Sequence, residues 1–460
     1  MQRLLAIVWL TWKAAFRFRL FIVLAVLLLA AVVGLPILIK DDGTARGFTQ
    51  ILITYTLGAI TALLGLSTLW LACGTLARDI DECQIQVVAV KPIPRWQIWL
   101  GKWLGIMSLN AVLLALSGLS VYGLLLWRAT RLPADEQKIL HEEVLVARGS
   151  ARPPNLSKKI EEETDRVLKD RLQKNPGIRA DLAEVRKQIR EGIRAEYQIL
   201  PPGYSQKWEV PLGSAKDYLK DQPLRLRVKF NAADQSASGT FQVLWRVGVP
   251  RKTPLQHEEM MSVAPDTFHE VEIKPYFDAN GLLTITLANP NSTALLVPLE
   301  DGIEVLYRQG GFGPNFVRGL GIIFCWMALL AALGLASASF LSFPVAAFVS
   351  LALLGLALCS GTLSNAVSEG TLMGFNEETS SMGHSAADAV AIPVFRAVLG
   401  VIDLAKDFSP IDSLSTGRSI TWADLALAFV QIVLLLGGIL ALFGMIVLTR
   451  RELATAQSNQ

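Results

Sequence analysis

Six apolar stretches, each long enough to cross a bilayer, constrain the fold of this chain more than any other feature. A helix needs roughly 20 apolar residues to cross the hydrocarbon core. Runs of this kind predict six spans, at 20–39, 48–77, 103–127, 317–341, 344–362 and 422–449. We therefore expect an α-helical polytopic membrane protein of six spans, interrupted once, after the third span, by a charged block.

The charged block, residues 128–315, is expected to form an inserted α+β domain. Residues 129–315 hold 26 Lys and Arg against 26 Asp and Glu. This neutrality argues against nucleic acid as a partner, because phosphate binding needs clustered basic residues. The block contains no cysteine, so the sequence offers no disulfide framework for it.

Two different periodicities divide this block. Apolar residues spaced by three and four on both sides of Asn175–Gly177 predict an αα-hairpin within 134–200. From Trp208 the period changes to two, as in Leu224–Phe230, and Asp278–Gly281 is a hairpin turn signal. Short strands at regular spacing predict an antiparallel β-sandwich over 205–310.

Basic residues in short loops predict the orientation, because such loops stay in the cytoplasm. Lys and Arg precede the first span, lie between the second and third spans, and follow the sixth span. We therefore expect a multi-pass protein of the cytoplasmic (inner) membrane, with both termini cytoplasmic and residues 128–315 extracytoplasmic. The membrane parts are then 1–127 and 316–460.

Two segments are expected to lie at the membrane surface. Residues 1–18 have an apolar and a basic side, which predicts an interfacial amphipathic helix; the alternative is an extension of the first span. In the second outer segment, 363–421, the apolar stretch 392–404 is too short to span. We expect it to lie in the interface or to re-enter the membrane.

Motif searches argue against an enzyme and against an ion-coupled carrier. The sequence has no Gly-x4-Gly-Lys-Ser/Thr phosphate loop, no His-Glu-x-x-His and no Gly-x-Ser-x-Gly. The predicted spans carry almost no charged residues, whereas ion-coupled carriers usually need them. We expect no cofactor on this chain, and any ATP would be bound by a partner subunit.

The loop between the second and third spans, residues 78–102, has the character of a docking segment. Pro92 and Pro94 prevent a continuous helix, so short pieces can protrude from the membrane. Charged side chains offer contacts to a cytosolic partner, and the run Val87–Val90 is suited to a shallow apolar groove. The alternative is an ordinary charged turn anchored by tryptophans.

The same loop resembles that of permease subunits of type-2 ABC exporters. The family pattern is an acidic residue, a glycine two positions later, an apolar run, a proline, a basic residue three positions later, and Gly-Lys entering the third span. The pattern falls on Asp81, Val87–Val90, Pro92, Arg95 and Gly101–Lys102, and Cys83 stands where the glycine is usual. A second similarity is Ser409–Asp412 followed by Gly417–Trp422, which leads into the last span.

The resemblance implies a permease that forms a dimeric path with a second copy or a related subunit. A separate cytosolic ABC ATPase would dock on the loop. The implied docking residues are Asp81, Glu82, Val87, Val88, Lys91, Pro92, Arg95, Trp96 and Lys102.

Two alternative functions remain open. One is an ATPase-driven mechanical or signalling protein that acts through its outer domain without moving a solute. The other is a membrane-anchored extracytoplasmic binding scaffold with passive spans.

Overall fold

The computed structural model separates the chain into two compact units. Unit 1 comprises Met1–Val146 and Gly311–Gln460, and unit 2 comprises Ala147–Gly310. The residues described are 2–17, 20–38, 44–81, 94–140, 144–174, 182–213, 215, 219, 222–234, 239–248, 257–276, 278, 280–369, 375–376, 381–382, 388–406 and 408–451. Unit 2 is thus a single insertion in the chain of unit 1.

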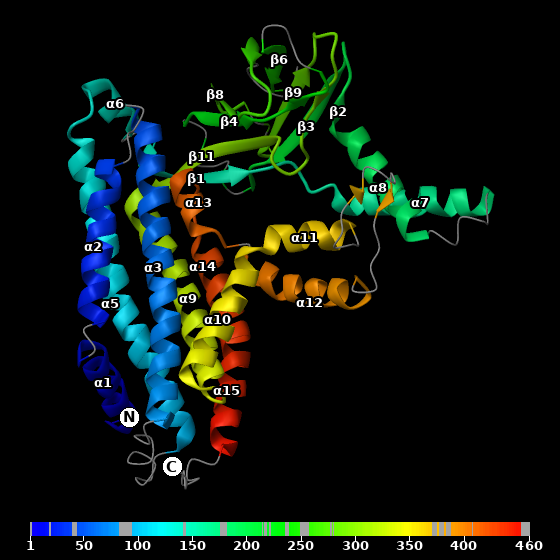
Figure 1. The fold of residues 1–460 in the computed structure, drawn as a ribbon. Coiled ribbons are helices and arrows are strands. Elements are labelled where there is room, and N and C mark those ends of the chain that lie inside the picture. The colour runs from blue at the N-terminus through cyan, green and yellow to red at the C-terminus, as the bar shows by residue number, and fades with distance from the viewer. Residues whose placement is uncertain are drawn as a thin grey trace. The chain divides into compact units, whose positions relative to one another are not determined.

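Unit 1 is a bundle of long apolar helices (Figure 1). Within the described ranges, four helical stretches are long and apolar enough to cross a membrane. They are α3 (Ala45–Asp81), α5 (Arg95–Ala129), α9 (Phe312–Ala338), and the continuous stretch of α14 (Trp422–Ala428), the π-helix η4 (Phe429–Gly437) and α15 (Gly438–Arg450). The predicted spans at 48–77, 103–127, 317–341 and 422–449 lie in these helices, which is the pattern of an integral membrane protein.

The remaining helices of unit 1 are shorter. α2 (Leu20–Leu38) and α10 (Phe343–Leu358) occupy the first and fifth predicted spans. The 16 residues of α10 give about 24 Å of helix, against a hydrocarbon core of about 30 Å. The others are α1 (Gln2–Arg17), α6 (Ala134–Ile139), α11 (Ser360–Glu369), α12 (Asp388–Lys406) and α13 (Pro410–Ser415), with a short hairpin of β12 (Phe375–Asn376) and β13 (Ser381–Met382).

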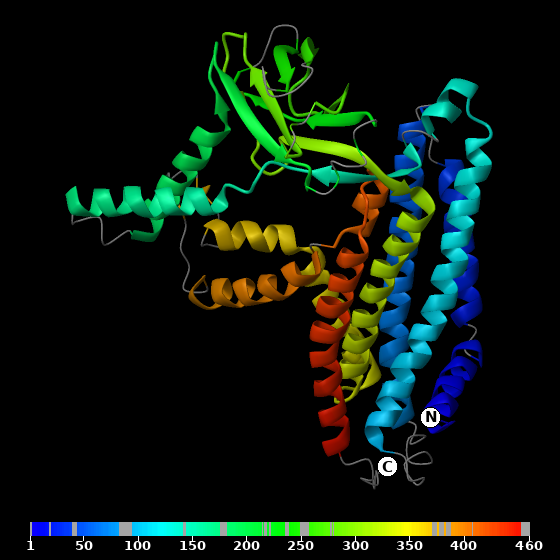
Figure 2. The same cartoon turned by 180° about the vertical axis from the view of Figure 1, so that it is seen from behind.

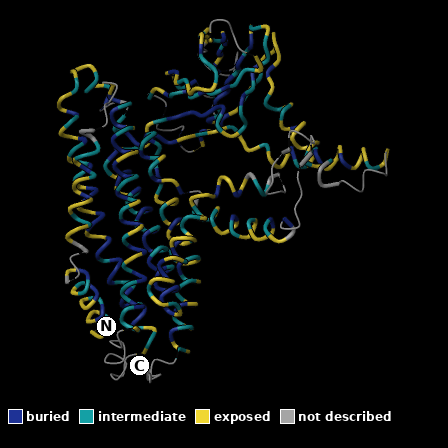
Figure 3. The backbone as a smooth tube through the Cα atoms, viewed as in Figure 1, coloured by how far each residue is buried: buried dark blue, intermediate teal, exposed yellow. Residues whose placement is uncertain are grey.

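Burial in the bundle follows the pattern of a membrane protein. Buried stretches run along the inside of the bundle, and exposed stretches run along its outside (Figure 3). The exposed residues include large apolar ones such as Val26, Leu119 and Leu442. α3 and α9 form the centre, where Gly334 brings the two backbones close together. A Cβ atom at position 334 would lie 3.0 Å from the carbonyl oxygen of Leu69.

α12 extends sideways from the bundle of long helices, next to α11, in both views (Figures 1 and 2). It packs on α11 with Ile392 and Leu399 buried, while Val390 and Val394 are exposed. The predicted surface segment at 392–404 is therefore part of a 19-residue helix, and its position relative to a bilayer stays a prediction.

The described residues of unit 2 form two four-stranded sheets with antiparallel pairings. One has the strand order β1-β11-β4-β8 and the other β3-β9-β6-β7; a small third sheet has the order β2-β10-β5. The strands are β1 (Val146–Ala151), β2 (Ile199–Leu200), β3 (Ser205–Pro211), β4 (Leu224–Val228), β5 (Asn231–Ala232), β6 (Phe241–Val247), β7 (His257–Val263), β8 (His269–Ile273), β9 (Leu282–Ala288), β10 (Leu295–Leu296) and β11 (Ile303–Gly311).

One hydrophobic cluster joins the two larger sheets. Leu226 and Val305 from the first sheet share this cluster with Trp245 and Ile285 from the second. The alternation predicted for 224–230 appears in β4, where Leu224, Leu226 and Val228 are buried. The period of two therefore identified the inward-facing residues correctly.

The helices of unit 2 form a pair with a small core of their own. α7 (Ser157–Lys174) and α8 (Leu182–Gln198) contribute Ile160, Leu168, Ile189 and Ile193 to it. The predicted turn at 175–177 lies outside the described residues. The range 134–200 is not wholly helical, because β1 forms within it and joins the first sheet beside β11.

Candidate functional site

The ends of the predicted docking loop belong to two long helices. Asp81 is the last residue of α3 and Arg95 is the first residue of α5. The candidates Glu82, Val87, Val88, Lys91 and Pro92 lie outside the described residues. The structure therefore shows how the loop is anchored at its two ends.

Lys102 joins the two helices that carry the loop. Its ammonium nitrogen Nζ lies 2.5 Å from Asp79 Oδ2 and donates to the carbonyl oxygen of Thr75 at 2.7 Å. The Lys102 side chain is only 9% exposed. This geometry assigns Lys102 to the α3–α5 contact rather than to direct contact with a partner. Asp79 could not be predicted from the sequence, because the family pattern singles out Asp81 and no local signal pairs position 79 with position 102.

Arg95 ties the start of α5 to the end of the last long helix. Its Nη1 atom donates to the carbonyl oxygens of Leu448, Thr449 and Arg451 at 3.0, 2.8 and 2.7 Å. The last carbonyls of a helix have no partners within the helix, and a cation there also interacts favourably with the helix dipole. Arg95 is therefore a side-chain cap for α15.

Two further contacts extend these connections to α9. Arg451 donates from Nη1 to the carbonyl oxygen of Ser339, the residue after α9, at 3.1 Å. Trp103 of α5 donates from Nε1 to the carbonyl oxygen of Ala328 in α9 at 3.1 Å. The first turns of α5 are therefore bonded to α3, α9 and the end of α15.

Trp99 fills the space between these helices. Its side chain is buried, and a Cβ atom built on Gly444 of α15 would lie 2.8 Å from the Trp99 Nε1 atom. That same Cβ would lie 3.0 Å from the Cα atom of Ala336. Among the described residues the Nε1–H group of Trp99 has no hydrogen-bond partner, and packing holds this indole in place.

Few of the predicted docking residues that the structure describes have exposed side chains. Among the described candidates, Asp81 and Trp96 are exposed, and Arg95 is partly exposed. Nearby, the Arg78 guanidinium lies 4.6 Å from the centre of the Phe343 ring. An acidic and an aromatic group therefore stand at opposite ends of the loop, on a rigid base.

A helix from the amino terminus covers the side of α5 next to this site. Cβ atoms built on Gly101 and Gly105 would lie 2.8 Å and 2.7 Å from side-chain atoms of Ile7 and Thr11. Because residue numbers rise together along this contact, α1 runs in the same direction as α5. The sequence predicted an interfacial helix at 1–18; the structure adds that it is packed on α5.

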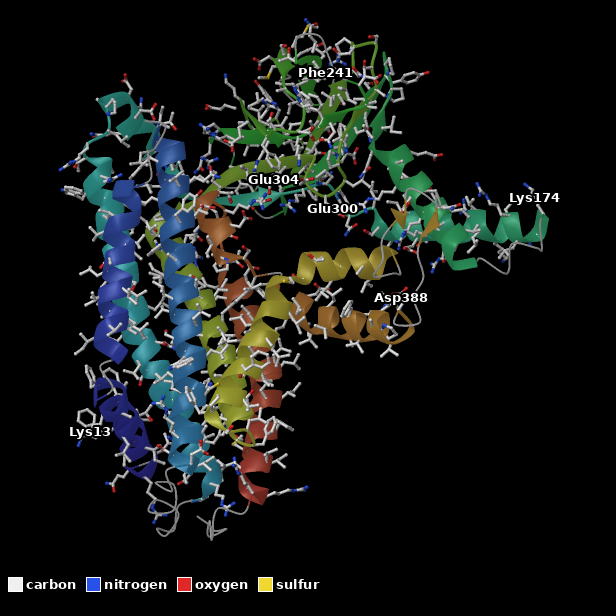
Figure 4. The ribbon with its side chains drawn as sticks, in the orientation of Figure 1. Lys13, Lys174, Phe241, Glu300, Glu304 and Asp388 are labelled. Atoms are coloured by element: carbon white, nitrogen blue, oxygen red, sulfur yellow. The ribbon has the colours of Figure 1, made fainter. Side chains whose placement is uncertain are left out.

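Unit 2 holds a separate charged network on its first sheet. The Glu304 side chain, 3% exposed, accepts from Ser150 Oγ at 2.5 Å and from Arg152 Nη2 at 3.1 Å, and Arg227 Nη1 lies 3.3 Å away. Glu270 pairs in the same way with Arg148 at 3.3 Å. Figure 4 shows Glu304 among these strands. Because arginine side chains neutralise its carboxylates, we infer that this network stabilises the sheet.

The described residues contain no group of three or more His, Cys, Asp or Glu that could hold a metal ion. No protein-family model, curated protein or solved structure matches this chain. The resemblance to type-2 ABC permeases therefore rests on sequence patterns alone, that of the loop and that of Ser409–Asp412 with Gly417–Trp422.

Proposed function

We propose that this chain is the permease subunit of an ATP-driven ABC exporter. In this proposal a separate cytosolic ATPase docks on the loop at 78–102, and two permease copies, or one copy and a related subunit, form the transmembrane path. The observation that carries the proposal is the anchoring of both loop ends. The pair of Lys102 and Asp79 joins α5 to α3, and Arg95 joins the start of α5 to the end of α15.

A rigid base is what a docking loop needs in order to pass on a movement. Interfaces and packed cores shift between discrete arrangements rather than deforming continuously. With α5 bonded to α3, α9 and the end of α15, a pull on the loop moves these helix ends together. A loose surface turn would instead absorb the movement.

The proposal includes a finer architecture. α2 and α10 complete six spans, and the two larger sheets of unit 2 form a β-sandwich, which their shared hydrophobic cluster supports. Both chain termini are cytoplasmic and unit 2 is extracytoplasmic; the basic residues of the short loops support this orientation.

Co-purification with charge reversal at an exposed position tests the docking step. The full chain is purified in mild detergent from its native membranes. We expect a protein with a Gly-x4-Gly-Lys-Ser/Thr loop to accompany it, together with ATPase activity. Asp81→Lys combined with Trp96→Ala should remove both, because these side chains are exposed at the ends of the loop.

The matched control is Asp135→Lys, an exposed acidic residue of α6 that is not part of the loop. Arg95 is left intact in this experiment because it caps α15, so its loss would disturb the fold as well as docking. An ATPase that stays bound to the Asp81→Lys, Trp96→Ala variant would refute docking at these residues.

A further inference from the structure

The amino-terminal helix α1 presents two faces with different chemistry. Ile7, Thr11 and Ala15 form one column, spaced by four residues, and all three are buried. Leu5, Trp9 and Lys13 form another column with the same spacing, on the opposite side of the helix, and all three are exposed. One face of α1 is therefore buried against the protein and the opposite face is exposed.

The buried face of α1 packs against α5. Ile7 and Thr11 lie directly over Gly101 and Gly105, with no room for a Cβ atom at either glycine. Trp12 adds a hydrogen bond from Nε1 to Ser108 Oγ at 2.7 Å. Small residues of this kind let two helices approach closely in membrane proteins.

The exposed face of α1 carries both large apolar side chains and positive charge. Leu5 is 64% exposed and Trp9 is 61% exposed. The Lys13 ammonium nitrogen stands 5.9 Å from the centre of the Trp9 ring. Figure 4 shows Lys13 on the side of α1 that points away from the bundle. Three basic residues, Arg3, Lys13 and Arg17, lie in this helix, and its sequence contains no Asp or Glu.

We propose that the exposed face of α1 binds anionic lipid headgroups at the membrane surface. Tryptophan and leucine enter the headgroup region, while lysine meets lipid phosphate. The next helix, α2, also exposes apolar residues, Ile22, Val26 and Leu29, which are suited to acyl chains. A second copy of the chain fits this face less well, because it would bring Lys13 against the same basic face.

The test uses the full-length protein in nanodiscs, with a dye at Gln2→Cys in a variant whose four native cysteines are replaced by serine or alanine. Energy transfer is measured to head-labelled phosphatidylglycerol and, separately, to head-labelled phosphatidylcholine at equal content. We expect transfer to favour the anionic lipid. One basic residue near a charged surface corresponds to a factor of about five in binding, so Lys13→Gln should lower the preference by about that factor.

Three variants define the outcome. Lys13→Arg should keep the preference, Trp9→Ala should weaken transfer to both lipids, and Lys138→Gln, an exposed lysine of α6, should change neither. Equal transfer to the two lipids, or a preference unchanged by Lys13→Gln, would overturn the proposal. Transfer between dyes on two copies would instead identify a second copy as the occupant. No ATPase takes part, so this result is independent of the proposed docking.

Discussion

The ion pair between Lys102 and Asp79 gives the sharpest test of how the loop is anchored. The atoms Nζ and Oδ2 are 2.5 Å apart, and the two side chains are 9% and 34% exposed. Removing one partner of a buried ion pair costs about 3–5 kcal/mol, because the other charge is left without compensation. Since the two partners differ in exposure, the two single substitutions should lower the free energy of unfolding by different amounts.

Asp79→Asn leaves the Lys102 ammonium nearly buried, with the hydrogen bond to the carbonyl oxygen of Thr75 still in place. We expect this variant to lose about 3 kcal/mol of unfolding free energy, the lower end of the range for a buried pair. Lys102→Met keeps the apolar stem and leaves the carboxylate of Asp79, which water reaches, so we expect a loss of only about 1 kcal/mol. The double variant buries no charge and should lose less than the sum of the two.

Equilibrium unfolding in mixed micelles of SDS and a mild detergent, followed by circular dichroism, measures these free energies. Lys138→Met, at an exposed lysine of α6, is the control and should change stability by less than about 0.5 kcal/mol. Equal losses in the two single variants, with simple addition in the double variant, would mean that the pair does not join α3 to α5. The base of the loop would then not be held rigid by this pair.

Three further predictions address packing, capping and unit 2. Gly334→Ala should cost about 1–3 kcal/mol in the same unfolding assay, because its Cβ meets the backbone of α3, whereas Gly123→Ala, with open space around it, should be neutral or stabilising. Arg95→Gln should speed hydrogen exchange in the last turn of α15, and Arg450→Gln, an exposed arginine of that turn, should not. The fragment 147–310 should be soluble and unfold cooperatively in urea because it has its own cores; an aggregated or non-cooperative fragment would contradict this.

Local sequence pattern predicted the long helices and strand faces because both depend on short-range periodicity. An uninterrupted apolar run determines where a helix crosses the hydrocarbon, so 48–77 and 103–127 fall within α3 and α5. These helices extend further, to Asp81 and from Arg95, because a helix does not have to end at the edge of the bilayer. In β4 the alternation correctly gave the buried side.

Contacts between distant segments were not predictable in the same way. The pairing of Asp79 with Lys102 depends on how α3 and α5 pack, and no periodicity records it. The strand β1, with Arg148 and Gly149 at its centre, lacks a clear alternating pattern and forms because β11 provides a neighbour. The resemblance identified residues of the loop, whereas the structure shows which of them are engaged within unit 1.

The anchoring contacts together favour one kind of movement over another. If the loop were pulled alone, the hydrogen bonds from Arg95 to α15 and from Lys102 to α3 would have to break. Charge-assisted hydrogen bonds are roughly twice as strong as neutral ones, so this route is costly. Moving the ends of α3, α5 and α15 as one body keeps every one of these bonds. If an ATPase docks on the loop as proposed, distances between spin labels on these three helix ends should therefore stay constant when it binds ATP. Distances from these labels to the corresponding helix ends of a second permease copy should change.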